Sequence, residues 1–546
     1  MSVASNMSSY EAACDGYHWD PPERYNFVRD VIDRWAADPD KIAMVWVDDS
    51  GNEQNVTFAQ LAARSCRLCN ALAAAGIQRG DTVLLVLGRQ IAWWETMTAC
   101  LRMGVVCSPG TIQLSPKDIV YRVNAASASA FITDTDNAPK LDEGADQCGT
   151  LKARIVTGGN RDGWLNYESI IEADGEDFET ADTAFEEDAL CYFTSGTTGY
   201  PKMTIHGHGY ALAHEISGRF WLDLRPDDVM WNISDTGWAK AAYSAYFGPW
   251  HMGAALFIHH TAVFDAARAL DLLEQFPITV MCSAPTVFRM LVLEDLSQRS
   301  FPKLRHCAGA GEPLNPEVIE VWQRATGVII RDGYGQTETV LLCGNYLCME
   351  PRFGSMGRPA PGIKLAIIDD EGNPLPSNEE GDIAVRVRPN PAPGLFTDYR
   401  GDTERFQACF RGDWYVTGDR GYVDEDGYFW FVSRSDDVIL SAGYRIGPFE
   451  VESALLEHPA VVESAVVASP DETRGAVVKA FVVPAAGVKT GDTLVRELQE
   501  HVRNVTAPFK YPRRIEFVDS LPKTVSGKIR RIELRERETA RIQDAK

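Results

Sequence analysis

The sequence predicts an α/β protein with a large N-terminal domain and a small α+β C-terminal domain. Three observations support this prediction. The chain has 546 residues, of which 45% are hydrophobic, so it can bury a large core divided over two or more domains. Its first half alternates strand and helix patterns, as parallel α/β layers do. After Arg434 the pattern changes to a helix followed by two strands.

The first elements are predicted by their apolar runs. Residues 81–88 (DTVLLVLG) predict a buried strand, and residues 91–110 (IAWWETMTACLRMGVVCSPG) predict a helix that runs into another short strand. Residues 172–188 contain nine acidic residues and no basic ones, which predicts an exposed connection. This connection leads into a short strand, ALCYF, at residues 189–193.

The later part of the chain predicts β-hairpins and then a small domain. Residues 366–376 (AIIDDEGNPLP) and 421–432 (GYVDEDGYFWFV) each show a strand, a turn with Asp and Gly, and a second strand. Pro448 opens a helix that carries Val451, Ala454 and Leu455 on one face. Two strands are predicted after it, at 461–469 (VVESAVVAS) and 476–484 (AVVKAFVVP).

The N-terminus and the cysteines indicate a cytoplasmic protein without integral membrane association. The first 20 residues contain no basic segment ahead of an apolar core, and the first arginine is Arg24. No apolar run approaches the roughly 18 residues needed to span a bilayer. Cys66 and Cys69 form one close pair without a second pair or a His cluster nearby, so we expect buried helix cysteines in a reducing cytosol and not a metal site.

The charge distribution excludes one class of partner. A net charge of -24 argues against general binding to nucleic acid. Residues 501–546, however, contain 12 Lys and Arg against 6 Asp and Glu, a local charge of +6. This end of the chain either attracts a compact anionic ligand or forms a solvated terminal helix over 529–543, and the sequence leaves both interpretations open.

The segment YFTSGTTGYPKM, residues 192–203, combines hydroxyls, glycines and one lysine. Its residues offer unobstructed backbone N–H groups, side-chain hydroxyls and the point charge of Lys202, a combination that suits a polyphosphate. The candidates in the loop are Thr194, Ser195, Gly196, Thr197, Thr198 and Gly199. The spacing differs from that of a P-loop NTPase, and a Ser/Thr/Gly loop by itself is also typical of a flexible connection.

Four further segments carry polar residues of related chemistry. Thr337 and Glu338 in DGYGQTET (332–339) supply hard oxygen ligands of the kind that Mg²⁺ accepts beside phosphate oxygens. Residues 415–437 supply Asp419, a carboxylate able to accept from two ribose hydroxyls, and Arg434 at a domain boundary. LSAGYRIGPFE (440–450) adds a Gly-flanked loop, and LPKTVSGKIRR (521–531) adds Lys528. Taken singly, each has a structural explanation: a turn residue, a helix cap or a solvated charge.

Together and in this order, these segments resemble the core motifs of the ATP-dependent adenylate-forming superfamily. MWNISDTGW (230–238), residues 443–467 and residues 509–531 look like the medium-chain acyl-CoA synthetase branch, and the resemblance covers nearly the whole chain. It implies an N-terminal domain over residues 1–434, with two layered α/β lobes and a β-rich subdomain. It also implies a small mobile C-terminal domain over residues 435–546.

The resemblance implies a carboxylate-CoA ligase that uses ATP, Mg²⁺ and coenzyme A. A carboxylate attacks the α-phosphate of ATP, pyrophosphate leaves, and the thiol of CoA then displaces AMP from the acyl-adenylate. The partners are therefore a small carboxylic acid, ATP and CoA, and the sequence does not decide whether the chain forms a homo-oligomer. Two alternatives stay open: an enzyme that adenylates an amino acid or acyl group for a separate carrier protein, for which Asp235 is the relevant residue, and an inactive nucleotide or acyl-CoA binding relative.

The resemblance also implies roles for individual residues in adenylation. Thr194 to Lys202 would hold the β- and γ-phosphates, Thr337 and Glu338 the α-phosphate and Mg²⁺, and Asp419 with Arg434 the ribose. Lys528 would reach the carboxylate and α-phosphate oxygens. The nucleotide-binding region would further include Gly311, Glu312, Asp332, Gly333, Tyr334, Gly335 and Gln336.

The second half-reaction would use the small domain. Asp436 matches the hinge position, and the loop around Gly443 would line the pantetheine tunnel. The members of that loop are Ala442, Gly443, Tyr444 and Arg445. Positions that match CoA contacts are Arg474, Asn504, Arg513 and Arg514.

The acid specificity is less clearly encoded. Gly335 occupies the position where acetyl-CoA synthetases carry a bulky Trp, so the resemblance implies an open pocket and a medium-chain, branched or aromatic monocarboxylate. Trp238, Tyr243 and Tyr246, near residues 282–285, are pocket candidates, although aromatics at this spacing are also typical of a core. We expect His206 and His208 to be loop or supporting residues and not a metal pair, because no third ligand is nearby in the sequence.

Overall fold

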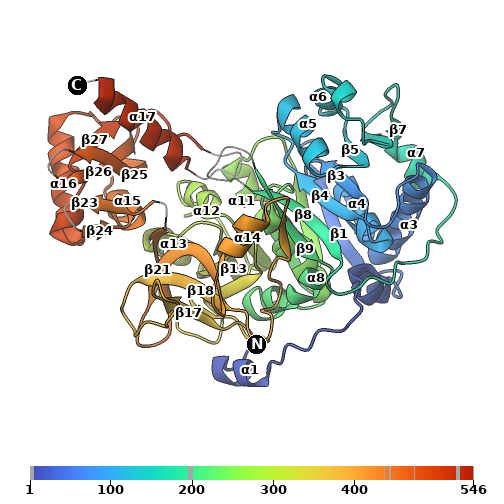
Figure 1. Cartoon of the computed structure of the whole chain (residues 1–546), viewed down its shortest axis with the longest axis horizontal. Helices are drawn as coiled ribbons and strands as arrows, with labels where there is room; N and C mark the ends of the chain where they lie inside the picture. The colour runs from blue at the N-terminus through green and yellow to red at the C-terminus, as the bar shows by residue number, and fades with distance from the viewer. Residues whose placement is uncertain are drawn as a thin grey trace.

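The computed structural model describes residues 5–194, 201–435, 437–441, 444–471, 474–523 and 529–544. Figure 1 shows three sheet-containing parts that together form the large domain, and a smaller lobe, in orange to red at the left, that contains α15–α17 and β23–β27. This arrangement confirms the predicted fold class: layered α/β lobes and a β-rich subdomain, followed by a smaller α+β unit.

The first sheet has eight strands in the order β19-β9-β8-β4-β3-β5-β6-β7. The last six strands in this order, from β8 at one end to β7 at the other, run parallel to one another. The two strands at one edge, β9 and β19, run antiparallel to their neighbours. The strands are β3 (Thr82–Val86), β4 (Val106–Gly110), β5 (Ala130–Asp134), β6 (Ala153–Thr157), β7 (Leu165–Asn166), β8 (Asp188–Thr194), β9 (Lys202–Gly207) and β19 (Asp398–Arg400).

The helices beside this sheet include α3, which is capped by Thr57, and α4, which ends at Gly104 with a φ of 68°. They are α3 (Phe58–Ala74), α4 (Ile91–Met103), α5 (Pro116–Ala125), α6 (Ala138–Asp142) and α7 (Tyr167–Glu172). The strands and the helix predicted over 81–110 are confirmed. Cys66 and Cys69 are buried in α3, as expected, and all twelve cysteines are free thiols.

The second sheet has nine strands in the order β16-β15-β14-β13-β12-β10-β11-β1-β2, with a parallel centre and antiparallel edges. The strands are β1 (Ile42–Asp48), β2 (Glu53–Thr57), β10 (Val229–Ile233), β11 (Ala255–His260), β12 (Val280–Ser283), β13 (His306–Ala310), β14 (Ile330–Gly335), β15 (Leu341–Gly344) and β16 (Arg358–Pro359). The remaining α-helices of the large domain are α1 (Tyr10–Gly16), α2 (Asp33–Trp35), α8 (Gly209–Ala213), α9 (Ala239–Ala245), α10 (Phe247–His251), α11 (Ala266–Gln275), α12 (Pro285–Leu291), α13 (Pro316–Thr326) and α14 (Thr403–Ala408).

The third sheet is antiparallel and consists of β17 (Leu365–Ile368), β18 (Gly381–Arg386), β20 (Phe410–Arg411), β21 (Trp414–Val423) and β22 (Phe429–Arg434). The hairpin predicted over 421–432 is confirmed as β21–β22, with Asp424 accepting the backbone N–H of Tyr428 in the turn. The hairpin predicted over 366–376 forms its turn, but its second arm is only an isolated bridge between Ile368 and Pro374. A proline has no N–H to donate to a ladder, which explains the missing strand.

The C-terminal lobe packs two sheets and three helices around two apolar clusters of its own, and α17 contributes Leu534 to the smaller one. Its elements are β23 (Ile439–Ser441), β24 (Tyr444–Ile446), α15 (Pro448–Leu456), β25 (Val461–Asp471), β26 (Gly475–Pro484), α16 (Asp492–Val505), β27 (Arg514–Phe517) and α17 (Arg531–Asp544). The helix from Pro448 and the two strands after it are confirmed. Val451, Ala454 and Leu455 are buried together on α15, as its sequence pattern predicts.

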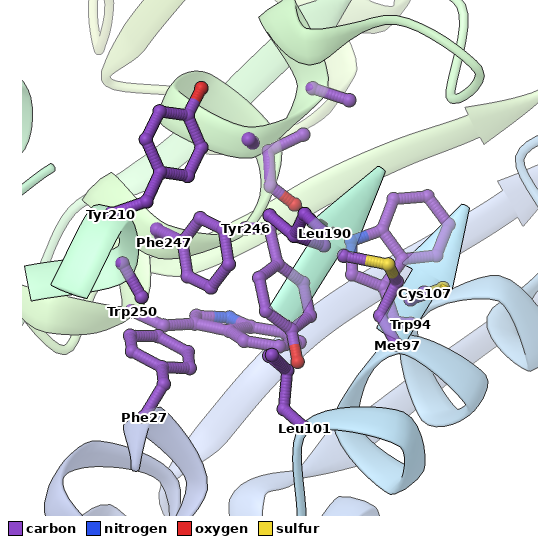
Figure 2. Packing of buried hydrophobic residues seen from close by; sticks show 14 of the residues in the cluster. Phe27, Trp94, Met97, Leu101, Cys107, Leu190, Tyr210, Tyr246, Phe247 and Trp250 are labelled. Carbon is purple, nitrogen blue, oxygen red and sulfur yellow. Dashed lines mark hydrogen bonds between the residues drawn. The ribbon is translucent and has the colours of Figure 1, made fainter. Parts of the chain in front are cut away.

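The main core of the large domain joins its two large sheets. Figure 2 shows the ring of Tyr246 among Phe27, Phe247 and Trp250, beside Cys107 of β4 and Leu190 of β8. Trp94 from α4 donates its indole N–H to the carbonyl of Ala245, 2.7 Å away. These contacts fix the relative position of the two sheets. The candidate site lies beside the β9–β19 edge of the first sheet, the segment that follows β14 of the second sheet, and the third sheet.

None of the helices in the described ranges is both long enough and apolar enough to cross a membrane.

Candidate functional site

A cavity of about 660 Å³ lies between β9, β19, the segment that follows β14, and the β20–β22 region. Its wall includes Lys202, Gln336, Glu338, Tyr399 and Arg434. These residues come from segments up to 232 positions apart in the sequence, and four of the five were predicted from motifs. The volume is within the usual range for small-molecule sites.

Lys202 and Glu338 form an ion pair on the cavity wall. The Lys202 Nζ lies 2.8 Å from Glu338 Oε1 and 2.5 Å from the hydroxyl of Tyr399, and this hydroxyl donates to Glu338 Oε1 at 2.6 Å. Burial by itself would raise the pKa of Glu338, but the Lys202 charge and the hydrogen bonds from Lys202 and Tyr399 outweigh it and lower this pKa below its ordinary value. Glu338 is therefore a buried carboxylate that already holds one cation.

This geometry fits a divalent cation. Glu338 supplies a hard anionic oxygen next to an ammonium group, and the side chain is held in place by its two neighbours. Mg²⁺ is typically bound by one or two carboxylates together with the phosphates of its nucleotide. Glu338 can serve as such a ligand once Lys202 turns to another anion.

His206 holds the segment that carries Glu338 through a hydrogen bond to its backbone. It lies in β9, not in a loop, four positions after Lys202, and its Nε2 is 2.7 Å from the carbonyl oxygen of Thr337. Because the partner is a carbonyl, Nε2 must carry the proton and donate. Burial lowers the pKa of His206 to about 4, despite the opposing effects of that carbonyl and of Glu338, so the ring is neutral near pH 7.

His208, which follows β9, is also buried, and burial lowers its pKa to about 4. Its two ring nitrogens have no hydrogen-bond partner among the described residues.

Asp419 is the centre of a hydrogen-bonded group at the end of β14. Its Oδ2 accepts from the hydroxyl of Tyr334 at 2.5 Å and from the amide of Gln336 at 2.6 Å. Its Oδ1 lies 3.3 Å from Arg434, which is its register partner across β21 and β22. The hairpin therefore presents a carboxylate and a guanidinium side by side, as the predicted ribose contacts require.

The predicted adenine region lies along β13 and β14. Asp332 is buried, which raises its pKa to about 8 against the lowering effects of the Gly333 and Leu314 N–H groups and of Lys240. A side chain at Gly333 would collide with Trp221, because an added Cβ would lie 2.6 Å from its ring. Gly311 has a φ of 105°, and Glu312 pairs with Arg289 of α12 at 2.8 Å.

The acyl-pocket candidates lie in different surroundings. Trp238 directly precedes α9, and Tyr243 is in that helix, next to Trp221. Tyr246 is 0% exposed, its hydroxyl is 2.8 Å from Thr98 Oγ1, and its ring is part of the core in Figure 2. Packing also requires a glycine at position 335, because an added Cβ would lie 2.5 Å from the Val340 carbonyl oxygen.

Asp235 is bonded to its own surroundings. Its Oδ2 accepts from Thr111 at 2.9 Å and its Oδ1 accepts from the Gly237 N–H at 2.7 Å. Gly237 packs so closely on residues 110 and 111 that an added Cβ would lie 2.2 Å from the Thr111 nitrogen. Asp235 thus fixes the turn that leads into α9, which leaves less of its carboxylate for a substrate amino group.

Several predicted residues lie outside the described residues: Ser195, Gly196, Thr197, Thr198, Gly199, Asp436, Ala442, Gly443 and Lys528. Thr194 ends β8 opposite Lys202, so the two ends of the predicted phosphate loop are in register. Tyr444 is 52% exposed and stacks on Phe509, with ring centroids 4.4 Å apart. Arg445 is in β24.

The CoA candidates of the small lobe differ in how they are bonded. Arg514 donates to Ser469 Oγ at 2.5 Å and to the Pro470 carbonyl at 3.0 Å, so it also holds β27 to β25. Arg513 donates to the Tyr511 hydroxyl at 2.8 Å. Arg474 follows β25, and Asn504 is exposed near the end of α16. The basic terminal segment is therefore partly used inside the lobe.

Sequence reasoning missed Tyr399. Its segment, FTDYRG, matches none of the motifs considered, and its place in the site comes from the pairing of β19 with β9, where Tyr399 is opposite Thr204. Pairing between strands almost 200 residues apart leaves no local signal in the sequence.

Comparison with known proteins gives a consistent result. A family model described as AMP-binding enzyme matches residues 32–396, and one described as AMP-binding enzyme C-terminal domain matches residues 450–528. Acyl-coenzyme A synthetase ACSM3, mitochondrial, of Homo sapiens is 49% identical over 548 residues, which cover 98% of this chain and 94% of the relative.

Two solved structures are also similar over most of the chain. The crystal structure of the anthranilate CoA ligase AuaEII in complex with anthranoyl-AMP has a TM-score of 0.88 and 30% identity, and the match covers 96% of this chain and 99% of that one. A benzoate CoA ligase from Burkholderia xenovorans LB400 has a TM-score of 0.82 and 28% identity, and covers 94% and 100%.

Proposed function

Because the chain belongs to the AMP-binding enzyme family, we propose that it is an acyl-CoA synthetase, an AMP-forming acid–thiol ligase that uses ATP, Mg²⁺ and CoA. The observation that carries this proposal is the single cavity on which Lys202, Glu338 and Arg434 converge, with Asp419 beside Arg434. An ammonium group, a buried carboxylate and a carboxylate–guanidinium pair are the groups that a nucleoside triphosphate with its cation requires.

The reaction proceeds in two steps. A carboxylate oxygen of the acid attacks the α-phosphorus of ATP, a P–O bond forms, and pyrophosphate leaves with the electron pair of the broken bond. The CoA thiol then gives up its proton to solvent as its sulfur attacks the acyl carbon of the adenylate. A C–S bond forms, and AMP leaves with the electron pair of the broken C–O bond. Mg²⁺, when bound, supplies charge neutralisation at the phosphates.

The described residues act in this scheme by position and charge. Lys202, now paired with Glu338, would neutralise the β- and γ-phosphates, and Glu338 would be the ligand for the cation. Asp419 accepts from the ribose hydroxyls, with Arg434 beside it. Asp332 and Tyr334, two positions apart on β14, border the adenine. His206 holds the backbone at Thr337.

The small lobe supplies the remaining groups. We assign the domain boundary to residues 434/435, with Asp436 as the hinge, Lys528 as the adenylating lysine and Gly443 in the pantetheine tunnel. The two separate apolar clusters of this lobe and the separate family match over 450–528 support a unit that can move relative to the large domain. CoA contacts are assigned to Arg474, and to Asn504, Arg513 and Arg514 in the basic segment 501–546.

The substrate is assigned as a medium-chain, branched or aromatic monocarboxylate. The likeness to an anthranilate and a benzoate CoA ligase supports an acid larger than acetate, and so does a glycine at position 335. Each methylene that the pocket buries contributes about 0.8 kcal/mol, or roughly fourfold in affinity, so selectivity between neighbouring chain lengths is graded.

A cytoplasmic location is part of the proposal. Twelve free cysteines, nine of them buried, are in keeping with a reducing compartment. The curated relatives are named as mitochondrial proteins, and mitochondria are the alternative that cell fractionation with a tagged chain distinguishes.

The function is tested by measuring AMP release with ATP, Mg²⁺ and CoA over straight-chain acids from acetate to octanoate, isobutyrate, 2-methylbutyrate and benzoate. Mass spectrometry of the thioester confirms the product. We expect a maximum among the medium, branched or aromatic acids. No AMP release with any of these acids, combined with ATP–pyrophosphate exchange for an amino acid, would instead assign the chain to carrier-linked adenylation.

A further inference from the structure

Tyr399 connects the two charged residues of the cavity wall. Its hydroxyl accepts from Lys202 Nζ at 2.5 Å and donates to Glu338 Oε1 at 2.6 Å, while Lys202 and Glu338 are 2.8 Å apart. The three polar groups thus form a closed triangle. Its corners come from β9, from β19 and from the segment after β14.

The position of Tyr399 is fixed by packing. Its side chain is 1% exposed, and its ring packs against Phe396 with centroids 4.6 Å apart. The Lys202 Nζ also lies 4.1 Å from the centre of the Tyr399 ring, so the lysine is attracted by the aromatic face as well as by the hydroxyl. The pairing of β19 with β9 places Tyr399 opposite Thr204, two residues along the strand from Lys202.

The hydroxyl determines where the carboxylate points when the lysine is withdrawn. Without nucleotide, Glu338 has two donors on Oε1, from Lys202 and from Tyr399. Once Lys202 turns to phosphate oxygens, the hydrogen bond from Tyr399 is the one of these two that persists. A buried carboxylate with one oxygen held by a fixed donor presents its other oxygen in a defined direction, whereas one without such a donor rotates.

We propose that Tyr399 is a positioning residue for ATP and its cation: its hydroxyl holds Lys202 and Glu338 ready in the free protein and keeps Glu338 aimed at the cation once Lys202 has left. The proposal rests on the proposed function, since Lys202 and Glu338 are taken to meet the outer phosphates and the cation. Both of these interactions are made by ATP and neither by AMP alone. Loss of the hydroxyl should therefore weaken ATP binding and spare AMP.

The test is Tyr399→Phe, which removes the hydroxyl and keeps the ring. Calorimetry with ATP in the presence of Mg²⁺, and separately with AMP, measures binding without any carboxylic acid. We expect the affinity for ATP to fall about 10- to 100-fold, the usual effect of losing a hydrogen bond to a charged group. The affinity for AMP should be unchanged. In ATP–pyrophosphate exchange, the concentration of Mg²⁺ for half-maximal rate should rise.

Tyr10→Phe is the matched control. Tyr10 is also largely buried, and its hydroxyl donates to the Pro359 carbonyl at 2.8 Å, in a part of the chain that does not line the cavity. This variant loses one buried phenol hydrogen bond as well, and its ATP affinity and Mg²⁺ dependence should match those of the wild type.

Unchanged ATP affinity and Mg²⁺ dependence in Tyr399→Phe, or equal losses for ATP and AMP, would overturn the assignment. If Tyr399→Phe does not fold, Glu338→Gln is added to it. If the double variant folds, the hydroxyl acts through the Glu338 charge. If the double variant does not fold either, the proposed role of the hydroxyl is contradicted. A wild-type protein that binds ATP but activates none of the acids counts against the proposed substrates alone, whereas one that fails to bind ATP rejects the proposed function together with this inference.

Discussion

At the scale of single residues, the site depends on side chains that hold the backbone as well as on those that face the cavity. His206 acts through the Thr337 carbonyl, which is part of the peptide group that joins Thr337 to Glu338. Its buried neutral ring has an unpaired Nδ1 within the described part of the chain, so its one hydrogen bond is to that carbonyl. Removing this donor leaves a buried carbonyl without a partner and frees the segment that carries Glu338.

Replacing His206 tests this role. His206→Gln keeps an amide N–H donor and should retain most activity, whereas His206→Leu should lower kcat/KM for ATP about tenfold through loss of one hydrogen bond at a buried acceptor. Steady-state ATP–pyrophosphate exchange measures both. His251→Leu is the control. His251 is partly buried, burial lowers its pKa to about 4, and its Nε2 is 2.9 Å from the Ala211 carbonyl, away from the cavity. Equal kinetics for His206→Gln and His206→Leu would contradict the role.

Sequence motifs predicted the site residues that lie within short polar segments. Lys202 and Glu338 were predicted from a hydroxyl-rich loop and from a Thr-Glu pair, and they do meet in one cavity. Tyr399 could not be found this way, because its neighbours in sequence carry no polar motif and its contacts depend on the register of β19 with β9. Tyr246 illustrates the opposite case: an aromatic residue at a plausible spacing lies inside the core.

At the scale of elements, apolar periodicity predicted the strands and helices with apolar faces. It did not predict how a helix packs when the side chains that it buries are charged. Apolar residues recur at strand or helix spacing in the segment 81–110 and in the helix that begins at Pro448, so the sequence alone predicts these elements. Helix α17 looked like a solvated helix or an anion site. Instead its Glu538 is 0% exposed and accepts from Lys479 Nζ at 2.6 Å and from Ser469 Oγ at 2.5 Å.

This buried pair predicts that Glu538 anchors α17 to the small lobe. Lys479 also pairs with Glu516 at 2.5 Å, so Glu538→Gln leaves Lys479 with one carboxylate partner. This variant should destabilise the local structure of β25 and β26 by about 2 kcal/mol, the usual cost of losing a hydrogen bond to a charged group. Glu533→Gln on the same helix is the control. Glu533 is half exposed and pairs with Arg530, so it should change stability by less than about 1 kcal/mol. Hydrogen exchange of the β25 and β26 amides measures both, and equal effects of the two variants would reject the anchor.

The same pair predicts a pH dependence. Burial would raise the pKa of Glu538, but hydrogen bonds from Arg541, Lys479 and Ser469 and the Lys479 charge lower it to about 2. Because the folded-state pKa is lower than the ordinary value, the stabilisation is present above about pH 4.5 and is lost as the pH falls toward 2. The difference between wild type and Glu538→Gln in hydrogen exchange should therefore be full at pH 7 and shrink below pH 4.5.

At the scale of the whole molecule, the two half-reactions place different demands on one small lobe. The cavity residues of the large domain are already assembled, whereas Lys528 and Gly443 belong to the lobe and serve opposite steps in the proposed mechanism. Sequence motifs predicted both residues, and they lie outside the described part of the chain. If the lobe serves both steps as proposed, a substitution at one of these two residues should impair one half-reaction and spare the other.

Separating the half-reactions tests this division of work. Lys528→Ala should reduce adenylation, measured as ATP–pyrophosphate exchange, by two or more orders of magnitude, roughly the effect of removing one charge-stabilising group from a transition state. It should leave thioester formation from a supplied acyl-adenylate largely intact. Gly443→Leu should do the reverse, because its side chain would enter the path of the CoA thiol. Lys523→Ala, which removes a surface ammonium that pairs with Glu463, is the control for Lys528 and should leave both steps unchanged. Equal loss of both steps in Lys528→Ala would remove that lysine from its assigned role, and full thioester formation in Gly443→Leu would remove Gly443 from the tunnel, so each half of the two-step model can fail by itself.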